Sequence, residues 1–118
     1  MLGTYDGGGW PVGVVFDGTS VWVANDADGT VTKLRASDGA PQGTVHIGQS
    51  AFFLAFDGVH IWVTDMLDNT LTRLRRSNGA IQHVYATESE ASQVIYDGTS
   101  IWVANRSSNS VTKYTPSR

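Results

Sequence analysis

The sequence predicts an all-β fold, a β-propeller with three four-stranded blades per chain, and three observations support this. First, Val-Trp-Val or Ile-Trp-Val recurs around Trp22, Trp62 and Trp102, so equivalent residues lie 40 positions apart. Second, each repeat consists of short β-branched and aromatic runs between Gly, Asp and Asn turn residues. Third, a period of about 40 to 45 residues filled with short strands is typical of propeller blades. No segment has a helical period, so we expect no helix.

Each repeat is expected to run from an inner strand to an outer strand. In the first repeat the expected strands are 13–16, 21–24, 31–35 and 43–47. Loops such as Asp17-Gly18-Thr19-Ser20 separate them, since Gly tolerates positive φ and Asp bonds to the local backbone. We interpret 1–118 as a single propeller domain, with blade 1 at 13–47, blade 2 at 53–87 and the first three strands of blade 3 at 93–118.

The N-terminal segment is predicted to be a detached outer strand. Subtracting 40 from Thr44-Val45-His46 gives Thr4-Tyr5-Asp6, so residues 1–6 correspond to the outer strand of a last blade. Three blades span too little arc to bring the two ends together, so we expect two copies to close a six-bladed ring. In this homodimer each N-terminal strand pairs with the other copy's last blade. The expected interface residues are Thr4, Tyr5, Asp6, Val111, Thr112, Lys113 and Tyr114.

Composition narrows the classes of partner. The net charge of -3 argues against nucleic acid, which usually binds a basic surface. No stretch approaches the roughly 18 apolar residues of a membrane span, so no membrane partner is expected. The first residues have neither the basic nor the apolar region of an export signal, so a cytoplasmic location is the default expectation. There is no cysteine, and hence no disulfide.

A candidate ligand site is expected at the mouth of the central channel, where the loops that enter the inner strands gather. The sequence breaks its repeat there: Trp10 corresponds to Ser50 and Glu90, and Phe52-Phe53 corresponds to Ser92-Gln93. The candidate residues are Trp10, Phe52, Phe53, Glu88, Glu90 and Gln93. In a two-fold ring, Glu88 and Glu90 would supply up to four carboxylates, a set that could hold a divalent cation. We favour solvated loop acids, and predict no cofactor and no metal ligand.

Two further sets of residues recur with the repeat. Trp22, Trp62 and Trp102 are expected to pack between neighbouring blades. The basic residues Lys33, Arg73, Arg75 and Lys113 fall at or near one strand position, and we interpret them as solvated edge charges.

The pattern Asp-Gly-Thr-Ser-Val-Trp-Val-Ala-Asn at 17–25, followed by a polar loop and Val-Thr-Lys-Leu at 31–34, resembles bacterial propeller repeats of the YVTN and NHL-like class. That class includes blades similar to those of virginiamycin B lyase. The resemblance covers the whole chain and implies a propeller. Members of the class bind proteins, sugars or small molecules, and some are lyases or lactonases. The lyase uses a histidine base near the ring centre; here His46 and His83 are expected on outer strands and His60 in a hairpin loop.

No Ser-His-acid set can be assigned, so we predict no catalytic residue. The leading hypothesis is a non-enzymatic binding or scaffold module that assembles as a homodimer and offers a small-molecule or protein ligand a two-fold central pocket. One alternative is a lyase or hydrolase with a metal-assisted site at the ring centre, built from Glu88, Glu90 and Gln93 of both chains. Another is a fragment, designed or evolutionary intermediate propeller with no function of its own, which the long identical stretches of the first and third repeats favour.

Overall fold

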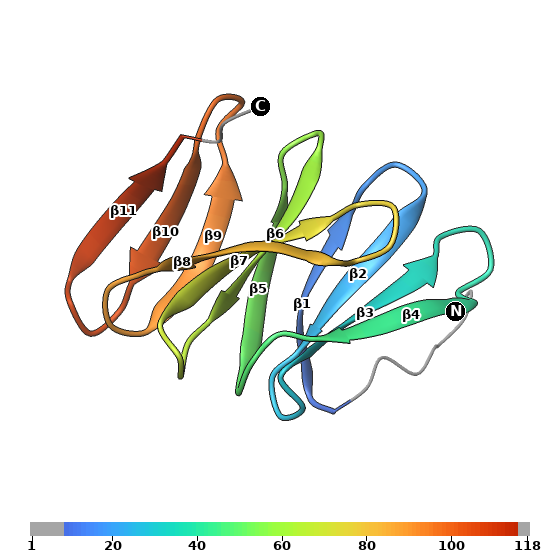
Figure 1. The fold of residues 1–118 in the computed structure, drawn as a ribbon, viewed down its shortest axis with the longest axis horizontal. Coiled ribbons are helices and arrows are strands. Elements are labelled where there is room, and N and C mark those ends of the chain that lie inside the picture. Colours follow the sequence, from blue (N-terminus) through green and yellow to red (C-terminus); the bar gives the residue numbers. More distant parts are fainter. Residues whose placement is uncertain (1–8, 116–118) are drawn as a thin grey trace.

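The computed structural model describes residues 9–115, which form β-strands joined by short turns (Figure 1). No helix occurs in this range, as the sequence predicted, and so none that could cross a membrane. The predicted strand at Thr4 to Asp6 lies outside the described residues. In chain order the strands are β1 (Pro11–Phe16), β2 (Ser20–Asn25), β3 (Thr30–Arg35), β4 (Pro41–His46), β5 (Ala51–Phe56), β6 (His60–Asp65), β7 (Thr70–Arg75), β8 (Ile81–Ala86), β9 (Ala91–Tyr96), β10 (Ile101–Asn105) and β11 (Ser110–Tyr114).

The strands form three antiparallel sheets, one for each sequence repeat. Their strand orders are β1-β2-β3-β4 in blade 1, β5-β6-β7-β8 in blade 2 and β9-β10-β11 in blade 3. Within the described residues, the outer edge of β11 has no strand beside it, whereas β3 pairs with β4 and β7 pairs with β8. The predicted propeller architecture is therefore confirmed for three consecutive blades.

The blades stand side by side in chain order, and their inner strands are neighbours (Figure 1). Strand β5 of the middle blade contacts both β1 and β9. Gly13 lets β1 approach β5 closely, because a Cβ atom there would lie 2.6 Å from the Phe52 carbonyl oxygen. The inner strands thus gather along one side of the arc, where a propeller has its central channel.

Two hydrophobic seams hold the blades together. At the first seam, Trp22 and Val31 of blade 1 pack against Leu54, Ile61 and Leu74 of blade 2. The second seam repeats this between blades 2 and 3, with the buried residues Ala55, Trp62, Leu71, Ala91, Val94, Ile101 and Val103. Burying one such aliphatic or aromatic side chain contributes roughly 1.5 to 3 kcal/mol. The tryptophans Trp22 and Trp62 therefore pack between blades, as predicted.

The turns follow the predicted chemistry with one correction. The Asp17 carboxylate accepts the amides of Thr19 and Ser20, at 3.0 and 2.7 Å, and so closes the β1–β2 hairpin. The loops of the β1–β2 and β5–β6 hairpins are each one residue shorter than predicted, because Ser20 and His60 are the first residues of β2 and β6 and pair with Arg35 and Arg75. Placing Ser20 and His60 in loops was therefore wrong, since the repeat does not show where pairing starts.

Candidate functional site

Each blade contains the same three-residue unit of an aspartate, a tryptophan and a cation. The indole Nε1 of Trp22, Trp62 and Trp102 donates to Oδ2 of Asp17, Asp57 and Asp97, at 2.8, 2.9 and 2.7 Å. A cation lies over each indole ring, 5.2 Å from the centroid for Lys33, 5.9 Å for Arg73 and 5.4 Å for Lys113. Interpreting Lys33 and Arg73 as solvated edge charges was wrong, because both are half-buried over a tryptophan on the interior strands β3 and β7. Lys113 and Arg75 are exposed, as that interpretation expects.

Blade 1 exposes apolar side chains on the face that points away from blade 2, which we call the front flank (Val14, Phe16 and Val23). Val14 is 67% exposed, whereas its repeat counterparts Leu54 and Val94 are 8% and 3% exposed inside the seams. Pro11, Val12, Gly13, Val14 and Val23 line an apolar groove of about 240 Å³ on this flank. The front flank therefore has the character of a blade interface without its neighbouring blade.

Blade 3 exposes the opposite face of a blade, which we call the rear flank (Ile95, Trp102 and Val111). Val111 is 64% exposed, whereas the counterparts Val31 and Leu71 are 1% and 0% exposed. Trp102 is only half-buried, while Trp22 and Trp62 are buried in the seams. The two flanks are thus the two different halves of one seam.

The predicted interface residues on β11 alternate between the faces of blade 3. Val111 and Lys113 lie on the rear flank, where Lys113 covers Trp102. The Tyr114 side chain turns towards blade 2 instead, and its hydroxyl donates to the Ala86 carbonyl at 2.8 Å. Burial, with a smaller effect of the Glu88 charge, raises the pKa of Tyr114. Thr112 is half-buried and accepts a hydrogen bond from Asn105 Nδ2 at 2.9 Å.

The predicted channel-mouth residues lie on or just before the inner strands. Trp10 comes directly before β1, is 74% exposed and has a φ of 56°, in the left-handed region. Phe52 and Phe53 are half-buried on β5, with ring centroids 4.7 Å apart. Gln93 is exposed on β9. These side chains are therefore spread along the inner strands of three blades.

The two glutamates of this set are held by hydrogen bonds to the loop and strand that follow β10. Glu88 Oε1 accepts from the Ser110 hydroxyl at 2.8 Å, and Glu90 Oε1 accepts from the Ser107 hydroxyl. Both carboxylates are thus committed to the local structure of blade 3. Between residues 9 and 115, no group of three or more His, Cys, Asp or Glu side chains is placed to hold a metal ion.

Sequence reasoning missed several residues at the seams. The Ser50 hydroxyl of blade 2 donates to Asp26 Oδ1 of blade 1. The Arg76 guanidinium of blade 2 reaches Asp17 of blade 1. A signal was present, because Arg76 replaces Ala36 in an otherwise similar stretch.

Comparisons with solved structures agree with this architecture. A Bacteroides fragilis protein assigned as a 6-phosphogluconolactonase aligns over 91% of this chain and 35% of its own, with a TM-score of 0.77 and 20% identity. A chain of the mitotic checkpoint complex aligns over 90% of this chain and 37% of its own, with a TM-score of 0.80 and 18% identity. Hydrazine synthase of Kuenenia stuttgartiensis aligns over 81% of this chain and 29% of its own, with a TM-score of 0.76 and 18% identity.

The fold is that of a β-propeller. The chain spans about a third of the length of these neighbours, and at such identities the likeness concerns the fold alone. The sequence matches no family model, and the comparison with curated proteins found no match.

Proposed function

We propose that this chain is a propeller module that closes into a six-bladed ring by pairing with a second copy, and that the ring binds a ligand at its central opening without catalysis of its own. The observation behind this is that Val14 and Val111, exposed at opposite ends of the arc, are counterparts of residues buried within the seams. Because the front flank of one copy is the natural neighbour of the rear flank of another, two copies satisfy both.

Ring closure would create a new seam, between the front flank of one copy and the rear flank of the other. The 40-residue repeat gives the counterparts there of the contacts at the first seam. An added Cβ on Gly79 would lie 3.5 Å from the Trp22 ring, and Lys33 Nζ donates to the Ser77 carbonyl at 3.1 Å. The same positions are held by Trp102 and Lys113 on blade 3, and by Gly39 and Ser37 on blade 1. Gly39 and Gly79 share a φ of 75°, so the receiving turn has the same conformation. Trp102 and Lys113 thus have a ready-made acceptor turn on a second copy.

A changed pair of residues fits the same seam. Ser50 and Asp26 are hydrogen-bonded across the first seam. Their counterparts at the new seam are Trp10 of one copy and Arg106 of the other. Both are exposed within one chain, and a guanidinium stacks favourably on an indole. The exposed Trp10 therefore gains a cationic neighbour on ring closure.

The N-terminal segment supplies the fourth strand of blade 3 in this proposal. β3 pairs with β4 through Val31↔Val45 and Thr32↔Thr44. The repeat converts these pairs to Val111 with Tyr5 and Thr112 with Thr4. Residues 47–50, four in number, join β4 to β5 of the next blade. In the proposal residues 7–10, also four in number, join the N-terminal strand to β1. Such a linker spans at most about 14 Å, so it reaches an adjacent blade and not one two blades away.

Ring closure would also complete a binding surface. It places two copies each of Trp10, Phe52 and Gln93 around one opening, and propellers commonly bind ligands there. Glu88 and Glu90 each accept a hydrogen bond from a serine of blade 3, so their carboxylates already have protein partners. This favours a binding role for the ring over the metal-assisted lyase or hydrolase. Kinship of the blades with the YVTN and NHL-like repeats is part of this proposal.

Cross-linking between the flanks tests the proposal, because the chain has no cysteine of its own. A double variant carries both Ser37→Cys and Lys113→Cys, and this protein is treated with a short bismaleimide reagent. The two positions lie in the first and last blades, so a short link joins them between copies. We expect a covalent species of exactly two chains in denaturing electrophoresis.

Each single-cysteine variant serves as the control for random collision. These variants should remain unlinked, since the two-fold axis separates identical positions. A ladder of longer species would indicate open head-to-tail chains instead of a ring. A double variant that stays unlinked would mean that the flanks do not meet. Either result would contradict closure.

A further inference from the structure

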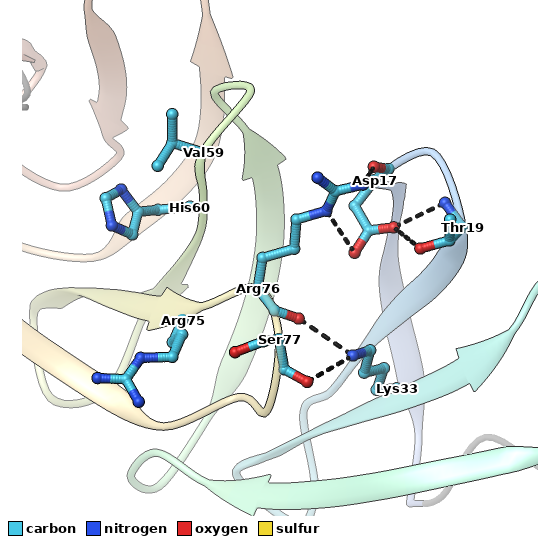
Figure 2. Close-up of a pocket in the computed structure, with 8 residues that line it drawn as sticks. All are labelled: Asp17, Thr19, Lys33, Val59, His60, Arg75, Arg76 and Ser77. Atoms are coloured by element: carbon cyan, nitrogen blue, oxygen red, sulfur yellow. Dashed lines mark hydrogen bonds and ion pairs between the residues drawn. The ribbon is translucent and has the colours of Figure 1, made fainter.

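An ion pair ties blades 1 and 2 together at one end of the first seam. Arg76 Nη2 donates to the Asp17 carbonyl at 2.6 Å, and Arg76 Nε lies 3.5 Å from Asp17 Oδ2. The pair lines a cavity of about 480 Å³ (Figure 2). Figure 2 shows the Arg76 side chain reaching across the seam to Asp17, so its charge is already matched within the chain.

The new seam between two copies would lack this ion pair. The counterparts of Arg76 and Asp17 there are Ala36 of one copy and Asp97 of the other. Asp97 accepts the Trp102 indole hydrogen at 2.7 Å, as Asp17 does for its own tryptophan, but Ala36 offers it no cation. A charged contact at the new seam therefore has to come from another part of the two flanks.

The loops that join the second and third strands lie at the opposite end of the seams from Asp17 and Asp97. At the second seam, Arg106 Nη1 of blade 3 lies 3.8 Å from Met66 Sδ of blade 2. Met66 and Arg106 occupy the same position of the repeat, which Asp26 occupies in blade 1. Each of these residues is therefore the neighbour of its own counterpart in the next blade.

This repeat position holds an acid, an uncharged residue and a base in chain order. Asp26 precedes Met66 at the first seam, and Met66 precedes Arg106 at the second. At the new seam, Arg106 of one copy precedes Asp26 of the other, so opposite charges meet at this position there and at neither internal seam. An aspartate Oδ and a methionine Sδ are the same number of bonds from Cα, so an arginine that reaches Met66 can span the equivalent gap to Asp26.

The surroundings of Asp26 suit an incoming guanidinium. Asp26 is half-buried, its Oδ1 accepts the Ser50 hydroxyl, and its amide donates to the Trp10 carbonyl at 3.0 Å. Neither of the two ion pairs found in residues 9–115 involves Asp26. Arg106 of a second copy would thus meet a carboxylate beside the exposed Trp10, and both groups attract a guanidinium.

We propose that an ion pair between Asp26 of one copy and Arg106 of the other makes the new seam selective for a second copy of this chain. The inference rests on the proposed ring closure, and the two-fold axis would place the pair twice in each ring. Complementary charges across an interface contribute mainly to partner choice and to the rate of association. Because Arg106 is exposed, added salt weakens the pair.

Exchanging the two charges tests this pair, with sedimentation equilibrium measuring the dissociation constant. Arg106→Asp and Asp26→Arg should each weaken association about tenfold, because both seams of the ring then hold like charges. An equimolar mixture of the two single variants should recover association to within about threefold of the parent. In the mixed ring each seam again holds one Asp and one Arg, so the recovered species contains one chain of each variant.

A milder pair of variants isolates the charge, since Asp26→Arg also disturbs the bond to Ser50. Asp26→Asn keeps an oxygen that can accept the Ser50 hydroxyl, and Arg106→Gln removes a charge without reversing it. Their effects on the dissociation constant should not be additive, because either one breaks the pair. Arg75→Asp makes the same change of charge on the exposed end of β7 in the middle blade, and should leave association unchanged.

The outcomes separate this pair from ring closure itself. A parent protein that stays a single chain would contradict ring closure, and the ion pair with it. If the parent is a two-chain species, equal weakening by Arg75→Asp, no recovery on mixing or additive effects of the Asn and Gln variants would overturn the ion pair and leave closure standing.

Discussion

Asp57 Oδ2 accepts the indole Nε1 hydrogen of Trp62 at 2.9 Å, while Oδ1 of the same carboxylate accepts the Val59 and His60 amides at 2.8 and 2.6 Å. One side chain therefore closes the β5–β6 hairpin and fixes the tryptophan that fills the second seam. Asp17 repeats this arrangement at the first seam, so turn formation and blade packing depend on the same residue in blades 1 and 2. Asp97 makes the same hydrogen bond to Trp102, which lies on the rear flank of blade 3.

Asp57→Asn should lower the free energy of unfolding by about 1 to 3 kcal/mol, because an amide NH₂ would face the buried Trp62 N–H with no acceptor between them. Urea denaturation measures the loss. Asp38→Asn is the matched control, since Asn78 already closes the equivalent turn of blade 2 through the Ala80 amide at 3.0 Å. The control should change stability by less than about 0.5 kcal/mol. Equal losses in both variants would contradict this role of the aspartate.

Asp65 should make stability fall as the pH rises. Burial raises its pKa, amides of Asp68, Ser50 and Leu67 partly oppose this, and the Asp68 charge adds to it. A raised folded-state pKa contributes stability that is fully present below the ordinary value of 3.8 and is lost as the pH rises through the folded value. Asp65→Asn, which installs the residue of Asn25 and Asn105, removes this titration.

The free energy of unfolding of Asp65→Asn relative to the parent should therefore increase between about pH 4 and pH 7. Urea denaturation at several pH values measures the difference. A difference that stays constant across this range would show that the buried carboxylate does not titrate as described.

Val14→Asp should prevent ring closure, because it places a charge at the centre of the front flank. Sedimentation velocity should show loss of the two-chain species, with the far-ultraviolet circular dichroism of the strands retained. Val84→Asp is the control, since Val84 is also exposed, at 49%, but lies on the outer strand of the middle blade. If Val14→Asp associates as the parent does, the front flank is not an interface.

Trp10→Ala should weaken association about tenfold while leaving the stability of the separate chain unchanged, since Trp10 is mostly exposed there. Dilution experiments with fluorescence anisotropy measure the dissociation constant. Leu67→Ala, at a 60% exposed position in the β6–β7 turn of the middle blade, is the control and should have no effect. A loss on Arg106→Ala that is not additive with Trp10→Ala would identify the two side chains as partners.

Much of the fold could be predicted from the sequence because the same local signals occur three times. The spacing of Trp22, Trp62 and Trp102 identified the blades, and β1 begins only two residues before its predicted start. Lys33 covers Trp22 within blade 1, where the two residues are paired across β2 and β3, so the contact became clear only once the register of the strands was known. The repeat could not show that Arg76 crosses to Asp17, because that contact depends on how neighbouring blades pack. The roles of the channel-mouth residues stay predictions, since these roles depend on a second copy and a ligand.

The most direct test of the central claim is the solution mass of the chain, measured by light scattering coupled to size exclusion across a dilution series. The account predicts about twice the chain mass of 12.7 kDa, persisting on dilution because two seams must open together. A mass of one chain at all concentrations would contradict ring closure.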